Sequence, residues 1–332
     1  MRAIVILLTL SVCSAEEITA EKLIEEGHWK RARVLVERRL REAPDDPNAT
    51  FLASQIRNAF GDRDAPLGLA EKAVRLDGGV ARYHRQLAEV QGVMAQHAGV
   101  FQQFMLARKF RSEIDATLRL DPRDTQALRD LLEFYLLAPG VVGGDAKKAA
   151  PVAERIAAVD AAEGYLAKAR IAEFQKDHAR TEEMLRRAAE VRPASYKALA
   201  ALGKALSAER REDSAVEDVG KSAVALDPGR IEGYCILAEV YARRSDWNAL
   251  EATLAAAAKA VPDDAAPYYR AAEVLIAEQR DPARVERYLR AYLAQEPEGN
   301  QPTAATAERE LKKARNAYAN GASNAVRTGG AR

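Results

Sequence analysis

Residues that end a helix recur along this chain at a nearly constant spacing. Successive closing positions are 34, 44, 39, 32, 35, 34 and 35 residues apart. Most of them are proline, which cannot continue a helix. Eight units of this size predict a stack of short helical hairpins in which each unit packs on its neighbours. The closing positions are Pro44, Gly78, Pro122, Ala161, Pro193, Pro228, Pro262 and Pro297.

One unit, residues 231–264, shows the internal pattern most clearly. Its two halves place apolar side chains three and four residues apart, as on one face of a helix, and a turn at Ser245 and Asp246 separates them. Small side chains are expected where the two helices cross, with large ones filling the gaps beside them. These residues are Tyr234, Leu237, Ala238, Tyr241, Trp247, Leu254, Ala257 and Ala258.

The pattern resembles the tetratricopeptide repeat (TPR), as found in exported bacterial proteins of uncharacterised function. The residues that carry the resemblance are Tyr234, Leu237, Ala238, Tyr241, Trp247, Ala257 and Pro262. It implies an all-α fold, a right-handed superhelical solenoid over residues 16–320 with about eight helix-turn-helix units. The expected units are 16–46, 47–80, 81–124, 125–161, 162–195, 196–230, 231–264 and 265–300, followed by a capping helix at 301–320 and a disordered tail at 321–332.

The first fifteen residues, MRAIVILLTLSVCSA, differ from the rest of the chain. Arg2, an apolar run and small residues before Glu16 predict a signal peptide, residues 1–15, and hence an exported chain, periplasmic or secreted. The run is too short to span a bilayer, and we expect no transmembrane segment after its removal. Lipid attachment at Cys13, as in an outer-membrane lipoprotein, is the alternative, although Val12 fits poorly before such a cysteine.

Charge and cysteine content narrow the expected partners. Cleavage after residue 15 removes Arg2 and no acid, leaving 49 basic against 49 acidic residues. A neutral chain lacks the basic field of nucleic-acid-binding proteins, so no nucleic-acid partner is expected. Cys235 is then the only cysteine, so no disulfide can form within the chain.

Two units depart from the common length. The 44-residue step contains VMAQHAGVFQQFMLARKFR, residues 93–111, which includes four of the chain's few large or flexible apolar groups. This segment is either a protruding extension that contacts a partner or lipid, or a pair of lengthened helices whose apolar face is buried. We favour the buried face. The apolar residues are Phe101, Phe104, Met105 and Phe110.

The 39-residue step contains FYLLAPGVVGGDAKKA, residues 134–149, a glycine-rich loop. Successive glycines can form an anion-binding nest, but the segment lacks the spacing of a phosphate-binding loop. Asp145 is expected instead to cap the following helix, and Pro151 predicts a kink or a later helix start.

Candidate catalytic and metal-binding groups are sparse. The four histidines show no paired ligand spacing, and those in turns between helices, His28 and His178, are expected to be exposed. Cys235 has no histidine near it in sequence and is expected to be a small core residue. We therefore expect no catalytic residue, no metal site and no cofactor.

The resemblance also implies a binding surface. In the family, the first helix of each unit lines a concave face that holds extended peptides or partner helices. Arginines there can bind carboxylates, or the charges can pair with one another and leave a solvated face; the sequence leaves both open. The expected groove positions are Arg82, Arg85, Glu89, Arg129, Glu133, Arg170, Glu173, Lys204, Glu239, Tyr269 and Glu273.

These features together predict a non-catalytic adaptor that binds a protein or peptide on its concave face, in the cell envelope or outside the cell. Two alternatives remain: a lipid-anchored outer-membrane assembly factor, and a small-ligand or anion-binding protein that uses residues 134–149. The oligomeric state is left open.

Overall fold

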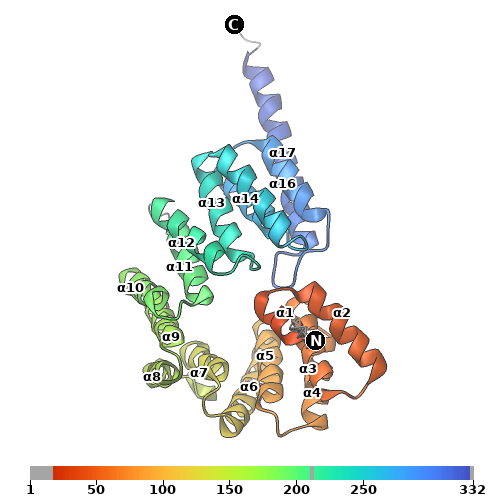
Figure 1. The fold of residues 1–332 in the computed structure, drawn as a ribbon, viewed down its shortest axis with the longest axis vertical. Coiled ribbons are helices and arrows are strands. Elements are labelled where there is room, and N and C mark those ends of the chain that lie inside the picture. Colours follow the sequence, from red (N-terminus) through yellow and green to blue (C-terminus); the bar gives the residue numbers. More distant parts are fainter. Residues whose placement is uncertain (1–17, 210–212, 330–332) are drawn as a thin grey trace, which may run out of the picture.

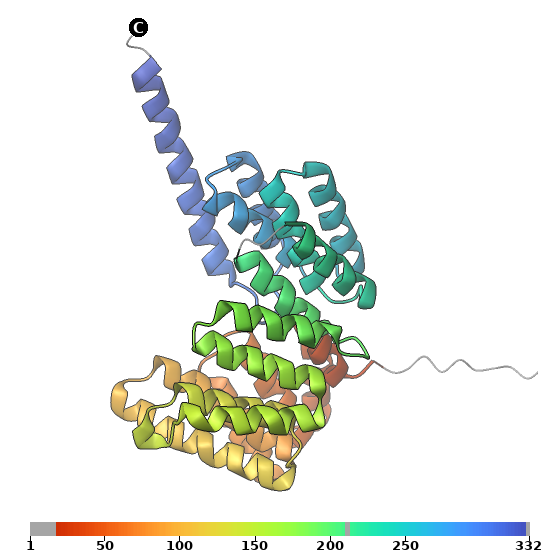
Figure 2. The same cartoon turned by 90° about the vertical axis from the view of Figure 1, so that its left-hand side faces the viewer.

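The computed structural model describes residues 18–209 and 213–329, with residues 317–329 described by their backbone alone. Every regular element in these ranges is a helix, and the helices pack in successive pairs (Figures 1 and 2). The predicted all-α array of helix pairs is therefore confirmed. The predicted signal peptide lies outside the described residues.

Sixteen of the described helices follow one another as eight pairs, and one further helix comes after them. In chain order these are α1 (Ala20–Glu26), α2 (Trp29–Glu42), α3 (Pro47–Ala59), α4 (Ala65–Leu76), α5 (Ala81–His97), α6 (Val100–Leu120), α7 (Thr125–Leu137), α8 (Ala149–Val159), α9 (Ala161–Phe174), α10 (His178–Glu190), α11 (Tyr196–Ala208), α12 (Asp213–Leu226), α13 (Glu232–Arg244), α14 (Trp247–Ala260), α15 (Ala266–Ala277) and α16 (Pro282–Leu293), followed by α17 (Ala304–Gly329).

The pair α13–α14 shows how the sequence forms a hairpin. Ser245 turns the chain with a left-handed backbone (φ 57°), and the carboxylate of Asp246 accepts a hydrogen bond from the first turn of α14. Ala238 and Ala257 are buried at the crossing, as predicted. Ala258 is exposed instead, because one residue along a helix turns a side chain by about 100°.

The lengthened pair α5–α6 combines the two readings of residues 93–111. Leu106 and Ile114 are buried, and Phe110 stacks on Phe134 with ring centroids 5.9 Å apart. At the turn between the helices, however, Phe101 is 81% exposed. The base of the hairpin is therefore core, whereas its tip is not covered by any described part of the chain.

Residues 134–149 form two short 3₁₀ turns, η1 (Gly140–Val142) and η2 (Ala146–Lys148). Asp145 caps the second turn by accepting from the Lys147 amide at 3.1 Å, and α8 then begins at Ala149. A side chain at Gly144 would place its Cβ 1.7 Å from the Ala138 carbonyl oxygen, so this position requires glycine.

The C-terminal helix α17 caps the array and continues beyond it. It packs on α16, and the Tyr292 hydroxyl donates to Pro302 O at 2.6 Å just before α17 begins. Figure 2 shows the far part of α17 extending away from the other helices. The helix runs to Gly329, past residue 320, where the sequence predicts the start of a disordered tail.

The first two units touch the last two, and we call these contacts the closure (Figure 1). Arg31 donates to Asp263 at 2.6 Å, and Arg33 donates to Glu296 through two nitrogens. The backbone amide of Asn300 donates to Ala59 O at 2.7 Å. These contacts join residues more than 230 positions apart, so the array forms a closed ring instead of an open arc.

Packing at the closure is close as well as polar. Gly299 lies against Trp29 and Ala59, and an added Cβ would stand only 2.8 Å from Trp29 Cγ. The side chain of Glu298, 3% exposed, accepts from the Lys30 amide at 3.0 Å. His28, expected to be exposed, is buried beside this contact, because the closure covers the turn between α1 and α2.

Candidate functional site

Two cavities lie on the concave side of the ring. They are lined mainly by the first helices of the central and later units. The middle cavity, about 490 Å³, is lined by α7, α9, α10 and α11, and it includes Arg129 and Arg170. The second cavity, about 660 Å³, is lined by α11, α13 and α15 and by residues of the closure, among them Trp29 and Asn300. We call it the closed cavity because the closure forms one of its walls. Several of the expected groove residues therefore line one of the two cavities, and the larger cavity ends against residues of the N-terminal units.

Most predicted groove charges are already engaged with other residues of the chain. Arg170 donates to Glu133 through two nitrogens, at 2.7 and 2.9 Å, and lies 3.5 Å from Glu173. Arg129 donates to Glu163 at 3.4 Å. The same holds outside the middle cavity, in the pairs Arg82–Asn48, Arg85–Asp124, Glu89–Asn58, Glu239–Ser207 and Glu273–Arg270.

Lys204 differs from the other groove positions. It lies exposed on α11, and its side chain forms no hydrogen bond or ion pair with residues 18–209 and 213–329. Lys204 lines both cavities, and so does Ala208 one turn further along the helix. The ammonium group therefore stands where the two cavities meet.

Arg230 is a second cation at the closed cavity that the repeat register did not identify. Its guanidinium lies over the Tyr196 ring, 4.2 Å from the centroid, and it has no ion pair among the described residues. Its buried Nε has no hydrogen-bond partner, and neither has the buried Oε2 of Glu232 nearby. Buried polar atoms normally have partners, so these two atoms mark a place that a ligand could satisfy. The only sequence signal for Arg230 is its place just before α13.

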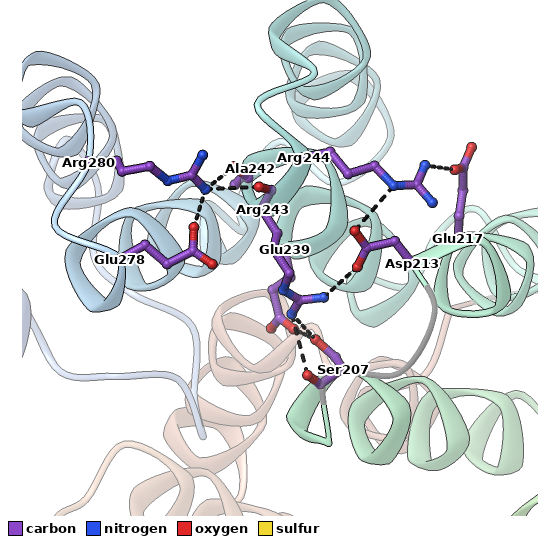
Figure 3. Close-up of polar contacts among 9 residues, drawn as sticks. All are labelled: Ser207, Asp213, Glu217, Glu239, Ala242, Arg243, Arg244, Glu278 and Arg280. Carbon is purple, nitrogen blue, oxygen red and sulfur yellow. Dashed lines mark hydrogen bonds and ion pairs between the residues drawn. The ribbon is translucent and has the colours of Figure 1, made fainter.

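A polar network fixes the ends of α11, α13 and α15 relative to one another (Figure 3). Ser207 donates to Glu239 at 2.6 Å and accepts from Arg243 at 2.9 Å. Arg243 also reaches Asp213, and Arg280 donates to the Arg243 carbonyl oxygen at 2.9 Å. Because these bonds cross from one unit to the next, they hold the wall of the closed cavity in a defined shape.

The prediction that Tyr269 faces the groove is wrong. The residue is 2% exposed and packs on Tyr292, with ring centroids 5.0 Å apart. Burial raises the pKa of the phenol, and the neighbouring Glu310 of α17 acts in the same direction. The capping helix therefore covers a position that would face solvent in an inner repeat.

Two buried acidic groups at the closed cavity have raised pKa values. Burial raises the pKa of the Cys235 thiol well above its usual value, so the thiol is protonated at neutral pH and a poor nucleophile. Asp264, which accepts a hydrogen bond from the Ala266 amide and is also buried, has its pKa raised to about 6 by burial. Among the described residues, no group of three or more His, Cys, Asp or Glu is placed to hold a metal ion.

The glycine loop offers no amide nest for an anion. The amides of Gly143, Gly144 and Asp145 donate to carbonyl oxygens of residues 140, 139 and 135, at 3.0 to 3.2 Å. Donors used inside the loop are not presented to a ligand.

Of the helices in the described ranges, none is both long and apolar enough to cross a membrane.

Comparisons with known proteins bear on the fold. No family model and no curated protein matches the chain. Yeast Tom70 is 13% identical with a TM-score of 0.56, over 94% of this chain and 66% of that chain. A thermophilic TPR protein of Thermus thermophilus is 18% identical (TM-score 0.49; 56% of this chain, 95% of that chain). At such identities the likeness concerns the fold alone, and the fold of this chain is TPR-like.

Proposed function

We propose that this chain is a non-catalytic scaffold that binds an extended segment of a partner protein in its concave groove. Lys204 is the observation that carries the proposal, because it is an unpaired cation at the junction of the two cavities. Stacked helical pairs offer long concave surfaces suited to such segments. The unpaired charge favours a segment that brings a carboxylate to this point.

The cations along the two cavities differ in what a carboxylate ligand would have to displace. Arg129 and Arg170 already bind Glu163 and Glu133, so a partner's carboxylate would have to displace those acids. At Lys204 and Arg230 nothing has to be displaced. A hydrogen bond between a charged donor and a carboxylate contributes about 1.5–3 kcal/mol, enough to set where the segment lies along the groove.

The test is a selection of displayed random peptides on the immobilised chain, followed by fluorescence anisotropy of a selected peptide. We expect enriched peptides to carry a carboxylate, and Lys204→Glu to weaken their binding by about tenfold or more. Lys312→Glu, an exposed change on α17, is the control and should leave affinity unchanged. Equal affinity for both variants, or no enrichment at all, would overturn the proposal.

We also propose that the chain is exported after cleavage behind Ala15. Support comes from the sequence of residues 1–15 alone: a charge, an apolar run and small residues before the cleavage point. Mass determination of the mature protein tests it. A mature chain that begins at Glu16 supports export, a lipid-modified Cys13 would instead support the anchored alternative, and an intact Met1 would exclude both.

A further inference from the structure

Two irregular turns lie next to each other on one edge of the ring. The turn between α5 and α6 belongs to the third unit, the loop with η1 and η2 belongs to the fourth, and η1 contacts α6. Arg111 of α6 donates to the Tyr135 hydroxyl at 3.1 Å, and Lys148 lies 5.8 Å from the centre of the same ring. The two segments thus form one surface, which we call the edge patch (residues 93–111 and 134–149).

The edge patch holds an unusual share of exposed apolar side chains. Of twelve large apolar side chains exposed in the described part of the chain, six belong to it. Phe101 is 81% exposed, and Val100 and Val141 are each 70% exposed. The other three are Val93, Met105 and Leu137. Apolar side chains gathered in this way mark an interaction surface.

Its charges are almost all positive. No acidic residue stands between Glu89 and Glu113, whereas the segment includes Arg108 and Lys109, which form no ion pair among the described residues. In the second segment Asp145 is the single acid, and its carboxylate caps η2. A chain of zero net charge after cleavage therefore concentrates cations around one apolar surface.

Apolar and basic side chains follow one another along one face of α6. Phe101, Met105 and Arg108 stand at spacings of four and three, so they share one face of the helix. Arg108 lies seven residues from Phe101, which is about 10 Å along the axis. That is close to the depth to which apolar faces enter the headgroup boundary of a bilayer, where basic side chains meet lipid phosphates.

We propose that the edge patch docks on the surface of an anionic lipid bilayer, with Phe101 and Val100 entering the headgroup boundary. None of the cavities described above is lined by the patch, so it offers a surface for a broad partner and no pocket for a side chain. The loop amides are bonded internally, which lowers the cost of moving this backbone out of water. The groove, which contains Lys204, is a separate surface.

Vesicle co-sedimentation of the mature chain tests the proposal. The probes are phosphatidylcholine vesicles with about one third phosphatidylglycerol, and pure phosphatidylcholine. We expect binding to the anionic vesicles, weaker binding to the neutral ones, and loss on adding salt. Phe101→Glu and the double change Arg108→Glu/Lys109→Glu should each weaken binding by about tenfold or more. All three residues are outside the buried core, so the variants should fold.

Matched changes elsewhere serve as controls. Leu226→Glu replaces another exposed apolar residue, and Lys312→Glu/Lys313→Glu reverses another adjacent basic pair. Both variants, and also Lys204→Glu, should keep vesicle binding, which separates this surface from the groove. Failure of the intact chain to sediment with anionic vesicles, or equal binding by the patch variants, would overturn the proposal. So would a chain that self-associates through Phe101 without binding lipid.

Discussion

At the scale of single residues, neighbours decide which groove cation is available. Glu163 accepts from both Arg129 and Lys197, at 3.4 and 2.6 Å, whereas no described acid lies within ion-pair distance of Lys204. Exposed pairs of this kind contribute about 0–1 kcal/mol each. Their main effect is to hold side chains in place, and Lys204 is left free for a ligand.

Gly164 tests the close crossing of α8 and α9. A Cβ there would stand 2.4 Å from Ala157 Cβ and 2.5 Å from its Cα, so the helices would have to move apart. Gly164→Ala should cost about 1–3 kcal/mol, seen as a lower urea midpoint by circular dichroism. Gly68→Ala is the matched control, with nothing within 4 Å of the new Cβ, and should gain about 0.5–1 kcal/mol. Equal shifts of the urea midpoint for the two variants would contradict the close crossing of α8 and α9.

The repeat register predicted part of the site and could not predict the rest. It placed Lys204, Glu239 and Glu273 on the groove, and all three line the closed cavity. Register follows from spacing within one unit, so it carries no information on contacts between distant units. Arg230, which precedes its helix, and Trp29, which arrives from the other end of the chain, were therefore missed.

At the scale of elements, local signals account for most helix boundaries. Closing prolines and capping aspartates act within a few residues, so they can be recognised in the sequence without knowledge of the fold. The exposure of the tip of α5–α6 could not be predicted, because periodicity shows an apolar face without showing whether another helix covers it. Likewise, the small polar residues after 320 suggest disorder, yet the structure places residues 321–329 in α17.

Asp246 gives a test of the capping account. Its carboxylate accepts from the Ala249 amide at 3.1 Å at the start of α14. Asp246→Ala should lower stability by about 1 kcal/mol. Asp64 occupies the same position before α4 without a capping hydrogen bond, so Asp64→Ala should change the urea midpoint much less. A larger loss for Asp64→Ala would contradict the assignment.

At the scale of the whole molecule, the closure turns a stack of repeats into a ring. It is built from ordinary charged residues at the surface of α2 and from loops near residues 263 and 296. No local pattern distinguishes these residues from solvated ones, which is why the sequence predicts a groove but not its closed end.

Glu298 makes the closure sensitive to pH. Burial raises its pKa to about 7, against the lowering effects of the Lys30 amide and ammonium, while Asp263 and Asp264 raise it further. The folded chain holds this proton while the unfolded chain has lost it, so stability should fall as pH rises from about 4.5 to about 7. A tenfold difference in proton affinity between the folded and unfolded chains corresponds to about 1.4 kcal/mol.

Glu298→Gln should remove most of that fall. The variant should match the intact chain near pH 4 and exceed it in urea midpoint near pH 8, because the amide carries no buried charge. The pKa of Asp264, raised to about 6, also makes stability fall as pH rises. The Glu298→Gln variant should therefore keep a smaller dependence of its urea midpoint on pH. Parallel pH profiles for the two chains would show that Glu298 is not buried as described.

Binding in the concave groove is tested most directly by placing a photo-crosslinking amino acid on each side of α11–α12 and adding a selected, labelled peptide. Ala208 lines both cavities, whereas Ala225 is an exposed residue of α12 that lines neither. If the peptide binds in the concave groove, it should crosslink at position 208 and not at 225, and Lys204→Glu should weaken the crosslink by about tenfold or more. Crosslinking at 225 with none at 208 would contradict binding in the concave groove.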